Sequence, residues 1–451
     1  MAHHFGLLGQ AHVEAKLVVV LVQLVVIIAA ARVCAALFRR IGQPAVVGEI
    51  AAGLILGPSV IGGIDALHPL WSTVFHPQID GVHETFTLLS QLGLIFLLFL
   101  IGLEFDFRHL RTSRGASLYI SIAGIVLPFA LGFALGKFMF PHIGMEPRLE
   151  TGFALFMGTA MSITAIPILG RIMMELGITR TRLGAVTITA AAVDDACGWI
   201  LLATVSALVM ADFHLLNTLM MLGLTLAFAG GMIFLVRPAL KWWINTRVQR
   251  EGEQLGVTTL AILIIVMFLC SIATSLIGIF AIFGAFLLGA ILSDQKAFRE
   301  AVGQRLNSFV TALFLPIFFT YTGLRTDIGT LDGGMMWVFA GLVSLLAIIG
   351  KFGGCTLAAK IGGFSNRESA SIGVMMNTRA LMELIVINVG YELGVIPRSV
   401  FCMLVIMALL TTVMTSPILV RLLRGTELEP LLHESGFVRP PRRQELTMSG
   451  G

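Results

Sequence analysis

The sequence predicts an all-α, polytopic membrane protein with about thirteen transmembrane helices, built from two inverted six-helix repeats. Hydrophobic residues make up 57% of the 451 residues and charged residues only 12%, whereas soluble domains carry about a quarter charged residues. Apolar runs of spanning length follow one another along the chain. Short motifs also recur in spans that must cross the bilayer in opposite directions.

The individual spans follow from the length of each apolar run, because about 20 apolar residues are needed to cross the hydrocarbon core. The first run continues past Arg32 without a clear signal-peptide cleavage site, so we interpret it as a span. The ninth run is short and the second contains Glu49 and Pro58, so eleven or twelve spans are also compatible with hydropathy. The predicted spans are 16–37, 44–61, 85–103, 116–140, 151–176, 183–210, 215–236, 256–275, 278–293, 308–324, 335–359, 368–395 and 399–422.

Lysine and arginine residues orient these spans, because short cytoplasmic loops accumulate positive charge. With the N-terminus outside, most of them fall in alternate loops and in the C-terminal tail, which places the C-terminus in the cytoplasm. We expect the cell (inner) membrane as the location. The net charge of +4 then reflects membrane topology, and no nucleic-acid partner is expected. The five cysteines lie in apolar runs without a CxxC pair, which indicates neither a disulfide framework nor a zinc site.

Two pairs of short motifs indicate an internal repeat. Gly102–Asp106 at the end of the third span resembles Gly323–Asp327 at the end of the tenth, and Gly53–Gly57 in the second resembles Gly289–Ser293 in the ninth. Both pairs are seven spans apart, and an odd displacement reverses the direction of crossing. Inverted repeats are typical of secondary transporters, whose sites lie near the midplane where interrupted helices meet. Spans one to six then correspond to spans eight to thirteen, with 215–236 as connector.

Two repeat-related spans carry polar interruptions. In the fifth span Thr159, Ser162 and Thr164 precede Pro167, which removes a backbone donor and can release carbonyl groups of the preceding turn. A proline kink there, and an intrahelical i,i+4 ion pair in the partner span, would explain the same residues without a transport role. Because the breaks are repeat-related, we favour helix ends that cross at the midplane. The polar residues of the twelfth span are Asn377, Thr378, Arg379 and Glu383.

Three further ionisable residues lie deep within spans: Asp194 and Asp195 in the sixth, and Lys351 in the eleventh. Insertion scales assign an aspartate at a helix centre a cost of about 2.5–3.5 kcal/mol, so such residues are usually functional. Neighbours on a helix point about 100° apart, so one aspartate can face a water-filled cavity while the other faces protein. Lys351 is too deep to reach the interface easily, and we expect one of the aspartates as its partner. A purely structural ion pair is the alternative.

This set of residues suits the exchange of protons for a monovalent cation. A buried carboxylate can hold a proton or a small alkali cation, but not both at once. If the site changes sides only when loaded, the two movements are coupled. Hydroxyl groups of the fifth span and freed carbonyl groups add hard oxygen ligands, which suit Na+ or K+. We therefore expect a transporter rather than an enzyme, with no cofactor, and a cation and proton site formed by Asp194, Asp195, Thr159, Ser162 and Thr164.

Six stretches carry motifs in a shared order along nearly the whole membrane region: Gly48–Gly62, Leu97–Leu110, Met161–Met173, Ala192–Ala203, Phe314–Ile328 and Met376–Gly390. In these stretches the chain resembles the second branch of the monovalent cation/proton antiporters, which includes bacterial sodium/proton antiporters and plant cation/proton exchangers. The resemblance implies the sodium/proton antiporter fold and a homodimer. It also implies a transmembrane domain over 1–424, with a scaffold (16–103 and 256–324), an elevator-like core (116–210 and 335–422) and the connector 215–236.

The resemblance also implies roles for individual residues. Asp195 matches the essential carrier of cation and proton, and Asp194 matches the acid that pairs with Lys351. Arg379 and Glu383 would compensate charge. Family members with both acids and this lysine exchange ions electrogenically. The segment Asn377–Arg379 is similar to that of the plant exchangers, whose ion preference is mixed, so we expect Na+ and leave K+ and Li+ open.

Other classes fit the sequence less well. The tail 425–451 is proline-rich, charged and expected to be disordered, and it is too short for the nucleotide-binding domain of ligand-gated K+ efflux systems. A K+/H+ efflux antiporter or a channel-like efflux protein remains the main alternative. A sodium-coupled organic-anion symporter shares crossing helices, but two acids and one lysine suit an anion poorly. Aspartates adjacent on one helix, without a GxGD motif, disfavour an intramembrane aspartyl protease.

Overall fold

The computed structural model describes residues 2–64, 74–75, 82–104, 115–164, 166–178, 181–210, 215–251, 256–379 and 381–434. The described residues form helices joined by turns, and no strand occurs among them, so the predicted all-α class is confirmed. The principal helices are α1 (Ala2–Arg40), α2 (Ala45–Leu56), α4 (Val82–Glu104), α6 (Ala116–Met139), α7 (Glu150–Ser162), α8 (Ile166–Glu175), α9 (Arg182–Met210), α10 (Leu215–Gly231), α11 (Arg237–Glu251), α12 (Val257–Ile277), α13 (Ala281–Leu292), α14 (Lys296–Phe309), α15 (Leu315–Leu324), α16 (Gly333–Ile348), α17 (Gly354–Ile361), α18 (Asn366–Met376), α19 (Leu381–Glu392), α20 (Arg398–Leu423) and α21 (Glu429–Glu434).

Within the described part of the chain, nine helical stretches are long and apolar enough to cross a membrane. Two shorter apolar helices, α2 and α13, correspond to the predicted second and ninth spans. The predicted fifth and twelfth spans are each two short helices separated by a break: α7 with α8, and α18 with α19. The multi-pass membrane class is therefore confirmed, and the number of thirteen spans stays a prediction.

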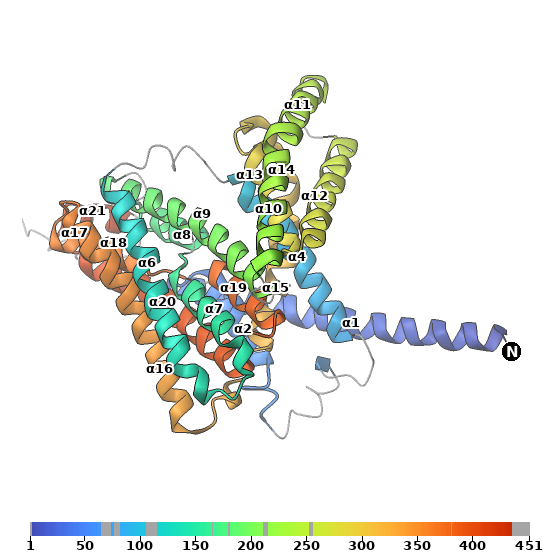
Figure 1. The fold of residues 1–451 in the computed structure, drawn as a ribbon, viewed down its shortest axis with the longest axis horizontal. Helices are drawn as coiled ribbons and strands as arrows, with labels where there is room; N and C mark the ends of the chain where they lie inside the picture. The colour runs from blue at the N-terminus through green and yellow to red at the C-terminus, as the bar shows by residue number, and fades with distance from the viewer. Residues whose placement is uncertain are drawn as a thin grey trace, which may run out of the picture.

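Several helices extend beyond the predicted spans. α1 begins at Ala2, and Figure 1 shows its N-terminal part projecting away from the other helices. α10 continues through the π-helical turn η3 (Met232–Val236) into α11, and α14 continues through the π-helical turn η4 (Val310–Phe314) into α15. Hydropathy marks only the apolar part of such helices, so their charged ends were not predicted.

The C-terminal tail differs from the expectation of disorder in its first part. α21 forms there, and Leu432 on this helix is fully buried among apolar residues that include Leu176 and Ile178. Burial of these apolar side chains fixes the short helix against the end of α8. Residues 435–451 of the predicted tail, and Asp106 of the predicted repeat motif, lie outside the described residues.

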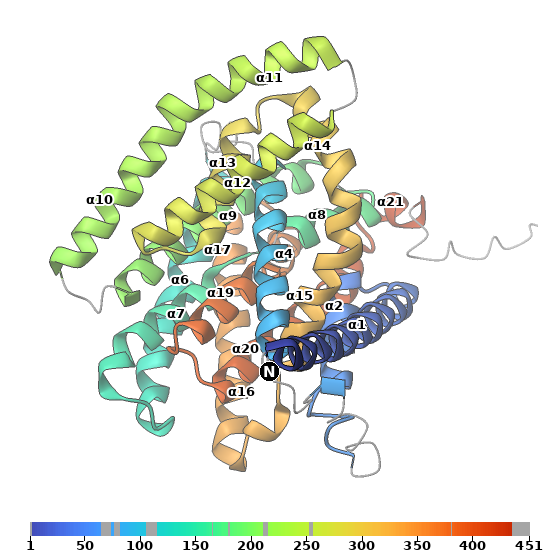
Figure 2. The ribbon, with the colours of Figure 1, turned by 90° about the vertical axis from the view of Figure 1, so that its right-hand side faces the viewer.

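The helices pack mainly within two sets. The first set contains α1, α2, α4 and α12–α15, and the second set contains α6–α9 and α16–α20. The first set covers most of 16–103 and 256–324, and the second covers most of 116–210 and 335–422. The division into a scaffold and a moving core stays a prediction. Figure 2 shows α10 and α11 running along the outside of the molecule.

One ion-pair cluster fastens α11, the helix that follows the connector, to the first set. Asp294, just after α13, accepts hydrogen bonds from Arg237, at 2.9 Å, and from Lys241, both on α11. Partial burial alone would raise the pKa of Asp294, but the hydrogen bonds and positive charges of Lys241 and Arg237 outweigh it and hold the pKa below its usual value. The carboxylate of Asp294 therefore stays ionised at neutral pH.

The glycines of the repeated motifs lie at two helix crossings of the first set. A Cβ atom on Gly53 of α2 would lie 2.7 Å from the Cα atom of Gly323 on α15. A Cβ atom on Gly102 of α4 would lie 3.1 Å from the Cα atom of Gly289 on α13, and 2.3 Å from a backbone oxygen of the same helix. Neither crossing has room for a side chain. Because the repeat relates Gly53 to Gly289 and Gly102 to Gly323, each crossing is the repeat image of the other.

A second pair of crossings follows the same relation. A Cβ atom on Gly48 of α2 would lie 2.6 Å from the carbonyl oxygen of Cys34 on α1, and one on Gly284 of α13 would lie 2.2 Å from that of Cys270 on α12. Gly48 and Gly284 are separated by the same number of residues as Cys34 and Cys270. The repeat therefore places corresponding small residues at corresponding contacts.

Candidate functional site

The first break of the site separates α7 from α8. α7 ends at Ser162, and the following residue, Ile163, is extended with φ −84° and ψ 143°. α8 begins at Ile166, so Pro167 lies in its first turn, where a missing N–H is tolerated. The same proline prevents α7 from continuing, because its ring would clash with the preceding turn. The last carbonyl groups of α7 are therefore without helical partners. The side chain of Pro167 lies outside the described residues.

The second break separates α18 from α19. α18 ends at Met376, and Asn377, Thr378 and Arg379 form the break before α19. The hydroxyl groups of α20 support this segment. The Thr412 hydroxyl lies 2.8 Å from the carbonyl oxygen of Arg379 and 2.8 Å from that of Ala408, so it can donate to either, and Thr378 donates to the Thr415 hydroxyl at 3.1 Å. The polar atoms of the broken backbone are thereby partly satisfied inside the helix bundle.

Arg379 joins the two breaks. Its guanidinium group is fully buried and donates to the carbonyl oxygens of Ala160 at 3.0 Å and Met161 at 2.7 Å, in the last turn of α7. A cation at this position satisfies orphan carbonyl groups and is favoured by the negative end of the helix dipole. Arg379 and Glu383 also form the i,i+4 pair, with 4.0 Å between Nη1 and Oε2. The pair is therefore present, but the hydrogen bonds of Arg379 to α7 reach across the crossing.

Lys351 reaches the crossing from the π-helical turn η6 (Ile349–Gly353), which joins α16 to α17. Its Nζ atom lies 2.5 Å from Asp194 Oδ2 and 2.8 Å from the carbonyl oxygen of Gly124 on α6, and it also contacts the carbonyl oxygen of Ser162. The side chains of Lys351 and Asp194 are both fully buried. A π-helical turn inserted in a helix is frequent at functional sites. The predicted partner of Lys351 is thus Asp194.

Thr164 connects Asp194 to the end of α18. Its Oγ1 atom lies within hydrogen-bond distance of Asp194 Oδ2 and 3.1 Å from the carbonyl oxygen of Met376. One hydroxyl hydrogen can donate to only one of these acceptors at a time. Thr159 and Ser162 donate within their own helix, to Leu155 at 2.7 Å and to Thr159 at 2.9 Å. The oxygen lone pairs of both hydroxyl groups are not used by these bonds.

Several buried acceptor atoms at the breaks and on α9 have no hydrogen-bond partner among the described residues. They are Oδ1 of Asp194, Oδ1 of Asp195, Oδ1 of Asn377 and both carboxylate oxygens of Glu383. Asp195 is only 2% exposed. A buried acceptor atom without a hydrogen bond is unfavourable, so these atoms call for water, a cation or, on the carboxylates, a proton.

The structure brings together most of the residues that the sequence singled out. Thr164, Asp194 and Lys351 are in direct contact, and Arg379 contacts the helix end that contains Ser162. Sequence reasoning missed the support from α20. A signal was available, because Thr411, Thr412 and Thr415 interrupt an otherwise apolar run. The carbonyl group of Gly124 left no such signal.

Comparisons with known proteins give one consistent result. Residues 26–425 match the family described as sodium/hydrogen exchanger, transmembrane. The chain is 38% identical over 409 residues to the Na+/H+ antiporter NhaS4 of Synechocystis sp., covering 90% of this chain and 97% of that protein. It is 37% identical to cation/H+ antiporter 18 of Arabidopsis thaliana, covering 91% of this chain and 50% of the plant protein. The sodium proton antiporter MjNhaP1 from Methanocaldococcus jannaschii has a similar fold, with a TM-score of 0.63, 17% identity and coverage of 92% and 99% of the two chains.

Proposed function

The chain belongs to the sodium/hydrogen exchanger family, and on that premise we propose that it exchanges protons for a monovalent cation across the cell membrane. The family match confirms the resemblance inferred from the sequence, and the structural match confirms the antiporter fold. We take Na+ as the first candidate because the relative NhaS4 is named for it. The plant relative is named for cations in general, so K+ and Li+ are tested beside it.

The observation that carries this proposal is the buried carboxylate of Asp195, one oxygen of which has no hydrogen-bond partner among the described residues. Its carboxylate is buried, one residue from the ion pair of Asp194 with Lys351, and its Oδ1 atom has no partner among the described residues. Such a group is stabilised when it holds a proton or a cation. We propose that Asp195 carries the two in turn. The other oxygen ligands would be Asp194, Thr159, Ser162 and Thr164.

Lys351 would couple cation binding to net charge movement. A cation that approaches Asp194 competes with the ammonium group of Lys351, which lies 2.5 Å from the same carboxylate. Displacement of Lys351 would let it release a proton in addition to the proton of Asp195. More than one proton would then move per cation, which makes exchange electrogenic.

We further propose the large-scale arrangement of the transporter. The second helix set moves against the first set like an elevator, and two copies of the chain associate through their first sets. In the inner membrane the N-terminus lies outside and the C-terminus in the cytoplasm. Arginines are frequent at the C-terminal ends of α1 and α20, and positive charge marks the cytoplasmic ends of spans. Reporter fusions at each terminus test the orientation, and cross-linking followed by mass determination tests the homodimer.

Exchange is tested by reconstitution into vesicles with an internal pH-sensitive dye and addition of Na+, Li+ or K+. We expect at least one cation to dissipate the proton gradient, and Asp195→Asn to abolish this response because an amide cannot carry the proton. Asp332→Asn is the matched control, since Asp332 is exposed at the start of α16. The proposal fails if no cation acts at any pH between about 6 and 9. A steady current without a proton gradient would indicate a channel instead.

A further inference from the structure

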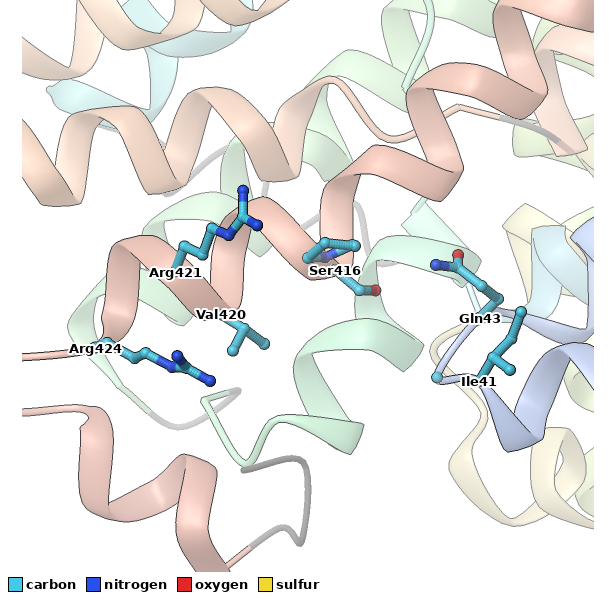
Figure 3. A pocket seen from close by; sticks show the side chains of 8 residues that line it. Ile41, Gln43, Ser416, Val420, Arg421 and Arg424 are labelled. Carbon is cyan, nitrogen blue, oxygen red and sulfur yellow. The ribbon is translucent and has the colours of Figure 1, made fainter. Parts of the chain in front are cut away.

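A pocket of about 340 Å³ lies between the turn that joins α1 to α2 and the last turns of α20 (Figure 3). Ile41 and Gln43 line it from the turn, Arg421 lines it from α20, and Arg424 lines it from the position just after α20. The pocket shares no residue with the site of Asp194 and Asp195. Its two walls belong to different helix sets, so whatever binds there touches both.

The position of Gln43 follows from a proline in α20. Pro417 has no N–H, so the carbonyl group of Val413, one turn earlier, lacks its helical donor. Gln43 Nε2 donates to this carbonyl oxygen at 3.2 Å. This bond fixes the orientation of the amide, because the opposite orientation would place two acceptor oxygens together. Gln43 Oε1 is then left buried and without a hydrogen-bond partner among the described residues, and Gln43 as a whole is only 8% exposed.

The other wall carries two available cations. Arg421 lies in the last turn of α20 and Arg424 is the residue that follows this helix; both side chains are exposed, and both line the pocket. Neither guanidinium group forms an ion pair within the part of the chain that the structure describes. Arginine side chains recognise phosphate groups through paired hydrogen bonds. This wall is therefore suited to a phosphate group, and the buried amide oxygen opposite it requires a hydrogen-bond donor.

The surroundings place this pocket at the membrane surface. It lies where the apolar helix α1 ends in the exposed Arg39 and Arg40, and Ile41 beside it is 69% exposed. Leu37, one turn earlier on α1, is 53% exposed. Basic pockets at the ends of membrane helices bind anionic lipid head groups, with apolar surface beside them for the acyl chains.

We propose that this pocket binds a phosphate ester whose alcohol part carries a hydroxyl group. The phosphate is held by Arg421 and Arg424, and the hydroxyl group donates to Gln43 Oε1. Two sources share this chemistry: an anionic phospholipid such as phosphatidylglycerol, and a soluble compound such as glycerol 1-phosphate.

Bound ligand would also affect transport, and this part rests on the proposed function. A ligand that bridges the α1–α2 turn and α20 favours the arrangement in which the two walls face each other. If the two sets move during exchange, saturating ligand slows exchange in wild-type protein but not in a variant without the two arginines.

Binding is measured without transport, through the thermal unfolding of the purified protein in dodecyl maltoside micelles. Adding phosphatidylglycerol should raise the melting temperature by about 2 °C or more relative to phosphatidylcholine, since a ligand of the folded state stabilises it. The double variant Arg421→Gln/Arg424→Gln should lose this increase. The matched control Arg299→Gln/Arg305→Gln, on α14 outside the pocket, should keep it. If the first double variant does not fold, Arg421→Gln alone is compared with Arg421→Lys, which should retain more of the increase.

The role of Gln43 is tested with phosphatidylmethanol, which has the same charge but no hydroxyl group. Wild-type protein should be stabilised more by phosphatidylglycerol, and Gln43→Met should remove the difference. Glycerol 1-phosphate added to phosphatidylcholine micelles identifies the source: an equal increase indicates a soluble ligand, and none indicates the lipid. The proposal is overturned if neither compound stabilises the protein in a way that depends on Arg421 and Arg424. Phosphatidylglycerol should raise the melting temperature of Asp195→Asn as it does that of wild-type protein. A failure of exchange and a failure of phosphate-ester binding are therefore distinguishable.

Discussion

At the scale of single residues, the ion pair of Lys351 with Asp194 is costly because both charges are removed from water. Both are fully buried, and removal from water costs several kcal/mol for each charge. The ammonium group has three hydrogens, and the structure provides three acceptors: Asp194 and the carbonyl groups of Gly124 and Ser162. Lys351 is therefore fully satisfied in this arrangement. Loss of either partner leaves the other charged and uncompensated.

Lys351→Ala should consequently lower the free energy of unfolding by about 3–5 kcal/mol, the usual cost of leaving one member of a buried pair alone. Adding Asp194→Asn to this variant should recover part of the loss, because the remaining charge is removed. Thermal unfolding in detergent measures both effects. In vesicles, exchange that survives in Lys351→Ala should no longer depend on membrane potential. Equal stability of the single and double variants, or an unchanged dependence on potential, contradicts the assignment.

The sequence allowed the charged residues to be predicted because Asp194, Asp195 and Lys351 are conspicuous in apolar runs. Their contacts could only partly be predicted. Two of the three acceptors of Lys351 are backbone carbonyl groups, which every residue possesses. The contact of Arg379 with α7 is likewise to backbone, so the i,i+4 pair with Glu383 was the only partner that residue types could suggest.

At the scale of helices, the crossings of the first set depend on the absence of side chains. A Cβ atom on Gly53 would lie 2.0 Å from the carbonyl oxygen of Thr320, a distance that requires the backbones to separate. The short sequence echoes pointed to these glycines, but not to their function as contacts. Similarity of sequence shows that two helices correspond. It does not show which helix each of them crosses.

Gly53→Ala should therefore lower the melting temperature clearly, because α2 and α15 must move apart and lose packing along the crossing. Gly289→Ala should have a similar effect at the repeat-related crossing of α13 with α4. Gly341→Ala is the control: this residue lies in α16, where an added methyl group would meet no described atom within 4 Å, and alanine is the better helix former. The interpretation is wrong if Gly53→Ala and Gly341→Ala unfold at the same temperature.

At the scale of the molecule, contacts between the two helix sets include a polar group near the end of α19. Gln91 on α4 donates to Glu392 at 3.2 Å, and Asn388 on α19 donates to Thr322 on α15 at 3.2 Å. The pocket of Gln43 and Arg421 also lies between the sets, beside the end of α20. The sequence predicted the two sets through family resemblance. It could not predict these contacts, because the residue types of Gln91, Asn388 and Thr322 do not indicate which helix each side chain faces.

Elevator motion requires the contacts between sets to open while those within a set persist. In a background without the native cysteines, Gln91→Cys/Glu392→Cys treated with a bifunctional methanethiosulfonate reagent should lose exchange and regain it after reduction. The control pair Thr87→Cys/Tyr321→Cys joins α4 to α15 within the first set, where the native hydroxyl groups lie 3.0 Å apart, and should keep exchange when cross-linked. Full exchange with the two sets tethered would mean that transport proceeds without relative motion at this end. The site of Asp195 would then have to change its access through local movement of the two breaks.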